Sequence, residues 1–599
     1  MSLLPRSRRS STPERNGPVR DEVGDEPAAA QPSAPESTDG EAEPTAGGEP
    51  QRPRPPVLVA LGRLLTALAV LLVLVALLVP GRLAELTVGA FLRLPAEAIA
   101  CLAVLLLLPV RARRVLAPVL GFVLAVLLIL RILDLGFLSV LDRQFNVLVD
   151  WKQLGDALNV LRDSIGETGT TAATVGAIAL AVALMVLLPL AVDRLTRLAG
   201  RRRPLALRVL AVAAPVWLVC ALLGVQVVPG VPVASANAAG MLTERSVQIV
   251  GSIRDRYVFA DEIAVDAYRD TPGDQLLTAL RGKDVLFTFV ESYGRSALEN
   301  PEYAPQIGAL LDQGTHRLAA AGFTARTGYL TSSTTGGNSW LAHAALMAGL
   351  WTNDQQRYNQ LVQTDRLTLN KAFGKAGWRT VGVMPGITKE WPEGRFFGYQ
   401  HLYDKPTLDY HGPNFGWGPV PDQFTMQRLQ EGEFSSPDHP PVMAEIALVS
   451  SHWPWAPLPR MVGWDELGDG SIFNPQIAEG LTYEEVWADE ARVRTEYRRS
   501  LEYTLEALLS YVETYGDDDT VMVVLGDHQP APNVTGEGAS RDVPITILAR
   551  DPAVLDRIAD WGWRDGLAPA PDSPVWRMDE FRDRFLVAYG PQDGTDGPR

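Results

Sequence analysis

Five long apolar stretches follow one another in the first part of the chain, at residues 57–80, 86–110, 114–133, 172–192 and 205–228. Each is close to the ~20 residues that a helix needs to cross the hydrocarbon core of a bilayer. The run ALAVLLVLVALLV at residues 67–79 has no polar face, unlike a helix on the surface of a soluble protein. The pattern therefore predicts five transmembrane helices within residues 56–230.

Between the third and fourth stretches lies a more polar segment, residues 134–171, which contains Trp151 and an alternation of apolar side chains around Phe145. It is typical of a helix or re-entrant piece at the membrane interface, and a plain outer loop fits equally well. After the membrane part, residues 231–282 read as a helical connector, with residues 241–258 as its best helical stretch.

From residue 283 the pattern changes to short apolar runs that alternate with helical segments. Strands are predicted at residues 285–290, 378–384, 445–450, 520–525 and 543–549, and helices at residues 344–350, 367–376 and 490–515. This alternation favours an α/β domain, residues 283–590, with a mostly parallel sheet covered by helices on both faces. Residues 1–55, rich in Pro, Glu, Ser and Gly, are predicted to be a disordered tail, and residues 591–599 a frayed one.

Basic residues lie on alternate sides of the apolar stretches. The flanking set is Arg52, Arg54, Arg111, Arg113, Arg114, Arg194, Arg197, Arg201, Arg202 and Arg203. Because cytoplasmic loops carry the excess of Lys and Arg, the amino terminus is predicted to be cytoplasmic. An odd number of spans then places the α/β domain outside the cytoplasmic membrane of a multi-pass protein.

The net charge of −16, with no basic stripe after the membrane part, argues against a nucleic-acid partner. The two cysteines of the chain, Cys101 and Cys220, both fall within predicted spans. The outer domain therefore has neither a disulfide nor a thiol nucleophile.

Two of the predicted strands end in residues that bind metals. Glu291 follows the strand at 285–290, and Asp527 and His528 follow the strand and glycine at 520–526. Open α/β sheets place ligands at the carboxyl ends of their strands, and carboxylate oxygen and imidazole nitrogen both bind divalent cations. These three side chains predict a divalent-metal site, although each of them alone is a weak signal.

A hydroxyl group precedes a predicted helix in the segment TTGGNSWLAHAALMAG, residues 334–349. Ser339 after the Gly336-Gly337 turn would lie at a helix amino terminus, which favours bound anions. Beside a divalent cation its hydroxyl could act as a nucleophile, and the alternative is that it only caps the helix. His452, directly after the strand at 445–450, could bind a transferred anionic group or protonate a leaving oxygen, or could simply face solvent.

In this order the motifs FVESYG at 289–294, a hydroxyl residue heading a helix, SSHWP at 450–454 and GDH at 526–528 resemble the alkaline phosphatase and sulfatase superfamily. Five spans before an outer domain look most like its lipoteichoic acid synthase branch, whose near relatives are membrane phosphoethanolamine transferases. The resemblance covers about residues 60 to 590. It implies that Glu291, Asp527 and His528 bind one metal, typically manganese, with Mg²⁺, Ca²⁺ or Zn²⁺ as alternatives. Ser339 would be both nucleophile and metal ligand, and His452 would contact the substrate phosphate.

The chain departs from the family pattern at three places. The sulfatase nucleophile segment continues x-Pro-x-Arg, where this chain has Leu341 and His343, which argues against formylglycine formation at Ser339. The synthase branch uses Thr as nucleophile, so Thr334 and Thr335 are fallback candidates. Glu291 stands alone after its strand, which favours one metal over two.

We expect His343, His452, Trp417 and Asp422 to bind substrate. Trp417 and Asp422 lie in an aromatic stretch rich in Gly and Pro, and a structural cover over the sheet fits them as well.

The sequence therefore predicts a membrane-anchored, metal-dependent phospho-group transferase of phosphoglycerol or phosphoethanolamine type, with a membrane lipid or lipid-linked glycopolymer as substrate. The alternatives are a phosphodiesterase or sulfatase-like hydrolase with the same site, and a degenerate, non-enzymatic membrane receptor. The sequence makes no prediction of oligomeric state.

Overall fold

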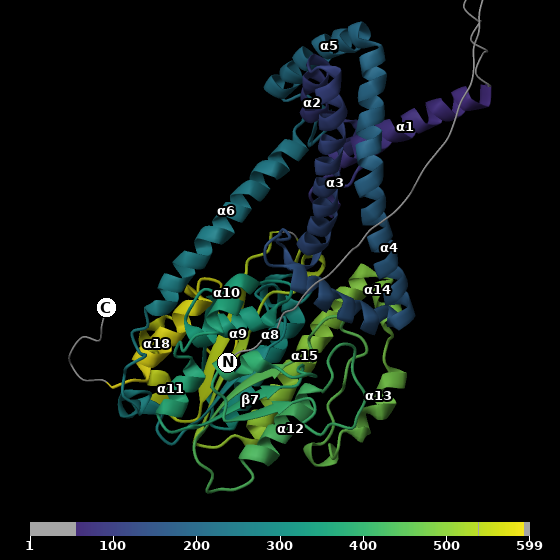
Figure 1. Cartoon of the computed structure of the whole chain (residues 1–599). Coiled ribbons are helices and arrows are strands. Elements are labelled where there is room, and N and C mark those ends of the chain that lie inside the picture. Colours follow the sequence, from purple (N-terminus) through teal and green to yellow (C-terminus); the bar gives the residue numbers. More distant parts are fainter. Residues whose placement is uncertain (1–55, 537, 592–599) are drawn as a thin grey trace, which may run out of the picture. The chain divides into compact units, whose positions relative to one another are not determined.

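The computed structural model describes residues 56–536 and 538–591 (Figure 1). The predictions of a disordered tail at residues 1–55 and of a frayed end at residues 592–599 lie outside the described residues.

Within the described residues, four helical segments are long and apolar enough to cross a membrane. They are α1 Pro56–Leu78, α3 Val110–Leu141, the Ile165–Arg201 part of α4 and α5 Arg203–Leu223. Their bounds overlap the first, third, fourth and fifth predicted stretches. The prediction of four of the five membrane-length helices is therefore confirmed.

The second predicted stretch, residues 86–110, forms a 3-10 helix, Val88–Leu92, and the 12-residue α-helix α2 Ala96–Leu107. At ~1.5 Å per residue this helix is far shorter than the ~30 Å hydrocarbon core. Arg93 interrupts the stretch, because its guanidinium donates to the carbonyls of Leu78 and Ala90. Pro95 follows in a short strand, β1 Leu94–Pro95, and Pro109 stops α2 at its other end. The expectation of five helices of full length is corrected to four and one short helix.

The polar segment at residues 134–171 is mostly helical. The helix α3 continues to Leu141, and α4 Trp151–Arg201 begins at Trp151 and breaks at Gly166, whose φ is 73°. Between them, Arg143 donates to both carboxylate oxygens of Asp150, at 2.6 and 3.0 Å. After the membrane part, three short strands, β2 Gln226–Val228, β3 Val231–Pro232 and β4 Ala234–Ser235, precede the 28-residue helix α6 Asn237–Ala264.

The α/β domain contains one sheet with strand order β12-β6-β11-β10-β5-β9-β7-β8, and β13 pairs with β6. The five strands from β10 to β8 are all parallel, whereas β11 is antiparallel to both of its neighbours. This arrangement confirms a mostly parallel sheet. The strands are β5 Asp284–Val290, β6 Thr324–Thr331, β7 Arg379–Met384, β8 His401–Asp404, β9 Val442–Leu448, β10 Thr520–Gly526, β11 Asp542–Ala549, β12 Arg564–Asp565 and β13 Val575–Arg577.

Alternate side chains of the central strands enter two apolar cores, one on each face of the sheet. Phe287 and Phe289 of β5 pack with side chains of α9, α11 and α18, whereas Leu286 and Val290 pack with side chains of α8, α12 and α15. All seven residues of β5 are buried, as expected for a strand in the middle of a parallel sheet. The helices of the domain are α7 Ser296–Glu299, α8 Ala304–Ala320, α9 Ser339–Ala348, α10 Gln355–Leu361, α11 Leu369–Lys375, α12 Asp422–Glu433, α13 Asn474–Glu479, α14 Tyr483–Trp487, α15 Glu490–Tyr515, α16 Pro532–Thr535, α17 Pro552–Asp556 and α18 Phe581–Ala588.

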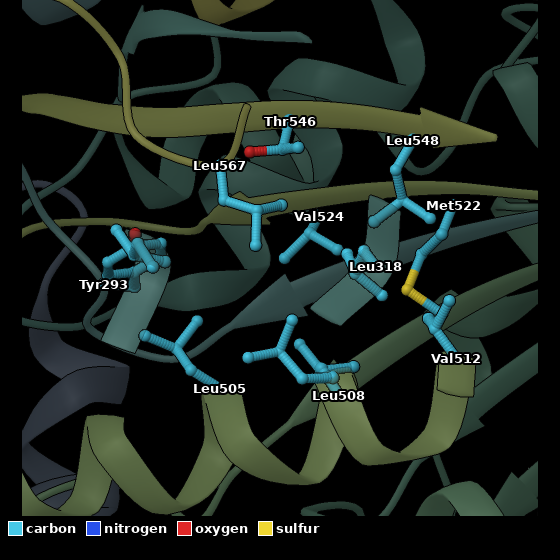
Figure 2. A pocket seen from close by; sticks show the side chains of 12 residues that line it. Tyr293, Leu318, Leu505, Leu508, Val512, Met522, Val524, Thr546, Leu548 and Leu567 are labelled. Carbon is cyan, nitrogen blue, oxygen red and sulfur yellow. The ribbon is translucent and has the colours of Figure 1, made fainter. Parts of the chain in front are cut away.

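A small apolar cavity of about 40 Å³ lies in the core between the sheet and α15 (Figure 2). Leu505, Leu508 and Val512 of α15 face Met522 and Val524 of β10 across it. Because its lining is almost entirely aliphatic, a water molecule there would find few hydrogen-bond partners.

Candidate functional site

The carboxyl ends of β5 and β10 bring three candidate metal ligands together. The two strands are parallel neighbours, and their register pairs Val290 with Gly526, so the residues that follow lie side by side. One ligand atom from each of Glu291, Asp527 and His528 lies within 4.8 Å of the others, and all three side chains are buried. The structure therefore brings together the three residues that the sequence analysis assigned to one metal.

Backbone groups fix the orientation of these ligands. The Oδ1 atom of Asp527 accepts from the backbone N–H groups of Ser292 at 2.8 Å and His528 at 2.7 Å. The Nδ1 atom of His528 lies 2.8 Å from the carbonyl oxygen of Gln529, to which it must donate. Its Nε2 atom is therefore the one that faces Glu291 Oε1, at 3.3 Å, and Asp527 Oδ2, at 3.5 Å.

Ser339 is the first residue of α9 and its hydroxyl lies within this group. The Oγ atom donates to Glu291 Oε2 at 2.9 Å and lies 3.2 Å from His528 Nε2. Gly336, Gly337 and Asn338 before it all have positive φ, at 70°, 148° and 64°, and this left-handed turn starts the helix at Ser339.

The fallback candidates are placed differently. The hydroxyl of Thr334 donates to the carbonyl of Gly337 at 2.7 Å, and Thr335 lies in a parallel bridge with Gln529. Neither of them heads the helix, so Ser339 alone occupies the position that the sequence analysis assigned to the nucleophile.

Charge in the cluster is strongly coupled. Burial and the nearby Glu291 carboxylate raise the pKa of Asp527 to about 7. Although burial disfavours the imidazolium, Asp527 and Glu291 raise the pKa of His528 to about 9. Burial by itself would raise the pKa of Glu291, but the imidazoles of His528 and His452 hold this pKa below its usual range. The group thus needs a positive charge between its two carboxylates.

The donor set fits a divalent cation. Two carboxylates and an imidazole with its lone pair directed at them are ligands that Mn²⁺, Mg²⁺, Ca²⁺ and Zn²⁺ accept. The bond from His528 to the Gln529 carbonyl is the support that ligating histidines usually have. Glu291, Asp527 and His528 would hold the ion, with Ser339 Oγ beside it.

His452 follows β9, the strand on the other side of β5. Ser451 fastens this turn, because its hydroxyl donates to the carbonyl of Glu291 at 2.6 Å. The His452 ring stacks on Trp417, with centroids 3.9 Å apart and planes at 23°. Burial lowers the pKa of His452, and its Nδ1 is bonded to the carbonyl of Trp453, which leaves Nε2 free for a ligand. Trp417 and His452, both predicted to bind substrate, are therefore neighbours.

Asp422 lies elsewhere than the sequence analysis expected. It is fully buried, with Oδ1 accepting from the N–H groups of Val449 and Ser450 and Oδ2 from the hydroxyl of Thr504. A side chain with no exposed surface cannot bind substrate, so that expectation is corrected. Asp422 instead anchors the turn that carries His452.

His343 is one helical turn after Ser339 and is nearly buried. Its Nδ1 lies 2.8 Å from Oε1 of Glu445, and its ring stacks on Phe289 with centroids 3.7 Å apart. The predicted strand begins at Glu445, and no function was predicted for this residue. The strand begins at Val442, so Glu445 is in its buried middle. The one feature of the sequence that could have indicated a role for Glu445 is that a charged residue interrupts the apolar run of β9, VMAEIAL.

Comparison with known proteins agrees with this geometry. Residues 283–547 match the Sulfatase family, and this match confirms the resemblance to the alkaline phosphatase and sulfatase superfamily. The chain therefore combines a domain similar to sulfatases with helices of membrane length. A search of curated protein sequences found no match.

Several solved structures are similar to the chain. The lipoteichoic acid synthase LtaP from Listeria monocytogenes is 15% identical over 57% of this chain and 79% of its own, with a TM-score of 0.35. The phosphoglycerol transferase GacH from Streptococcus pyogenes is 13% identical over 57% and 91%, with a TM-score of 0.33. The soluble domain of lipooligosaccharide phosphoethanolamine transferase A from Neisseria meningitidis is 12% identical over 53% and 93%, also at 0.33.

Proposed function

We propose that the protein is a membrane-anchored phospho-group transferase that acts on a lipid-linked or cell-envelope substrate through Ser339. The observation that carries this proposal is the hydroxyl of Ser339 at the amino terminus of α9, within 3.2 Å of two of the three metal-ligand side chains. A hydroxyl in that position is both activated and aligned toward an anionic group.

Ser339 and His452 carry out the first step of the proposed reaction. Ser339 Oγ bonds to phosphorus of a head-group phosphodiester as the bond to the leaving alcohol breaks. The proton lost by Ser339 ends on that alcohol, and we assign its delivery to His452. In the second step an acceptor hydroxyl attacks the Ser339 phosphoester, gives up its proton and restores the serine. The N–H of Leu341 already donates to the carbonyl of Asn338, so the N–H groups of Ser339 and Trp340 are the ones in the first turn of α9 that bind the phosphoryl oxygens.

Glu291, Asp527 and His528 would hold one divalent ion, with Mn²⁺ as our first choice. When bound, such an ion supplies Lewis-acid stabilisation of charge on the phosphoryl group and lowers the pKa of a coordinated hydroxyl.

The membrane segments suit this substrate class, because they keep the site near lipid head groups. We propose the cytoplasmic membrane, with the amino terminus cytoplasmic and the domain of residues 283–590 extracytoplasmic. With α2 too short to span the bilayer by itself, the proposed sidedness requires residues 86–110 to cross it together with their irregular flanks.

The test is to incubate the detergent-solubilised protein with total membrane lipid and Mn²⁺ and to identify the consumed lipid by mass spectrometry. We expect one phospholipid class to disappear with wild-type protein and to remain with Ser339→Ala. Products formed with and without an acceptor alcohol separate transfer from hydrolysis, which is the outcome for a phosphodiesterase with the same site. If no lipid is consumed at any metal concentration, the proposal fails.

A further inference from the structure

A buried carboxylate lies behind the helix that begins with Ser339. Glu445, in the middle of β9, has no exposed surface and accepts three hydrogen bonds. Its Oε1 faces His343 Nδ1 at 2.8 Å, and its Oε2 accepts from Asn370 Nδ2 at 2.7 Å and from the hydroxyl of Tyr399 at 2.8 Å. The surrounding side chains, among them Phe289 and Phe373, form an apolar core.

A buried carboxylate of this kind is unfavourable for the stability of a fold. A charged group in an apolar core costs several kcal/mol to desolvate, and apolar residues of similar volume often serve stability as well or better. Asn370 and Tyr399 are neutral donors, and His343 is the one partner in this network that can carry a compensating positive charge. The arrangement therefore points to a role for the imidazole rather than to stability alone.

The position of His343 relates it to the reacting groups. Side chains four residues apart lie on the same face of a helix, and each points back toward the preceding turn, so His343 reaches toward the turn of Ser339. Its ring stacks on Phe289, two residues before Glu291 on β5, and side chains two residues apart lie on the same face of a strand. His343 is thus placed on the face of α9 that carries Ser339 and on the face of β5 that carries Glu291.

Only one ring nitrogen of His343 remains free. Nδ1 is bonded to Glu445, and no protein group in the described part of the chain forms a hydrogen bond to Nε2. The side chain keeps 9% of its surface exposed, whereas Glu445 keeps none. Because Nδ1 is directed at Glu445, Nε2 is the ring atom that is left to meet a substrate oxygen.

We propose that Glu445 is a positioning residue that holds His343 so that Nε2–H donates to an oxygen of the transferred phosphoryl group. This inference rests on the proposed function and adds a second group that binds the phosphoryl oxygens, beside the first turn of α9. Glu445 does not touch the substrate.

The test measures binding of inorganic phosphate to the full-length, Mn²⁺-loaded protein by isothermal titration calorimetry. The variants are His343→Asn, Glu445→Gln, the double variant and Tyr399→Phe. Tyr399→Phe is the matched control, because it removes a different hydrogen bond from the same carboxylate. Metal content and thermal unfolding show that each variant is folded and loaded.

We expect His343→Asn and Glu445→Gln each to weaken phosphate binding on the order of tenfold, as for loss of a charge-assisted hydrogen bond. The double variant should be no weaker than the poorer single variant, and Tyr399→Phe should bind within about threefold of wild type. Equal loss in Tyr399→Phe and Glu445→Gln, additive losses, or wild-type protein that binds no phosphate would each overturn the inference. Lipid consumption by wild type and Ser339→Ala reports separately on the proposed function.

Discussion

Asp527 is the residue on which the proposed metal site depends most. It is 1% exposed, and one of its oxygens is already taken by two backbone N–H groups, so its other oxygen and its full charge are what it offers a cation. We expect Asp527→Asn to lose the stoichiometric divalent ion, because an amide is a neutral and weaker ligand. Elemental analysis of purified protein checks this. The control is Asp518→Asn, an exposed carboxylate that should leave the metal content unchanged.

Asp422 gives a pH-dependent prediction. Burial raises its pKa to about 6, although its hydrogen bonds from Thr504, Ser450 and Val449 act in the opposite direction. In the unfolded chain an Asp side chain has a pKa of about 4. Between about pH 4 and about pH 6 the Asp422 carboxyl is therefore protonated in the folded state and ionised in the unfolded state. The free energy of unfolding that this group contributes falls as the pH rises through that window. A rise in pKa from about 4 to about 6 corresponds to a loss on the order of 3 kcal/mol.

Asp422→Asn cannot titrate, so the difference in unfolding free energy between wild type and this variant should decline from pH 4 to pH 6 and stay level above. Chemical denaturation of both proteins across that range measures the difference. A constant difference would show that Asp422 keeps an ordinary pKa in the folded protein.

At single positions, the sequence predicted which candidate ligands lie together, but it did not predict the residues that support them. Glu291, Asp527 and His528 follow apolar strands directly, and parallel strands bring their carboxyl ends to one edge. Asp422 and Glu445 are supports whose roles depend on burial by elements distant in the sequence, which no local pattern reports.

Among the elements, β10 is packed unevenly on its two faces. Val524 faces the cavity of about 40 Å³ beside α15 (Figure 2). Val523 is fully buried in the core on the other face of the sheet. Val524→Ile adds one methyl group to empty space and should stabilise the domain by about 0.8 kcal/mol. Val523→Ile, the matched control, adds the same group to a filled core and should destabilise it. Denaturant unfolding separates the two, and equal effects would mean that the cavity is closed in solution.

The elements predicted from the sequence were those with strong apolar periodicity. The strands β5, β7, β9, β10 and β11 and the helix α15 were placed within a few residues. The strand β6 was missed because its sequence, TARTGYLT, has neither a continuous apolar run nor a regular alternation of polar and apolar residues. The second apolar stretch was overestimated because composition alone does not show that the Arg93 side chain turns back to bind backbone carbonyls.

In the molecule as a whole, a membrane helix touches the loop that carries the candidate nucleophile. A Cβ atom at Gly336 would lie 1.7 Å from the carbonyl oxygen of Val140 in the last turn of α3. Gly336 also has a φ of 70°, which disfavours other residues. We expect Gly336→Ala to separate α3 from this loop and to lower both thermal stability and transfer activity.

Gly282 provides the control, because it has a φ of 82° and nothing within 4 Å of its would-be Cβ. Gly282→Ala should show only the backbone cost, roughly 1 kcal/mol, and retain activity. If the two variants behave alike in thermal unfolding and lipid turnover, the contact between α3 and the loop is not formed.

The most direct test of the account is mass spectrometry of peptides from protein stopped during turnover of membrane lipid with Mn²⁺. The account predicts a phospho-group adduct on Ser339 that disappears in Ser339→Ala and in Asp527→Asn. An adduct on Thr334 or Thr335, or turnover with Ser339 unmodified and its alanine variant fully active, would contradict it.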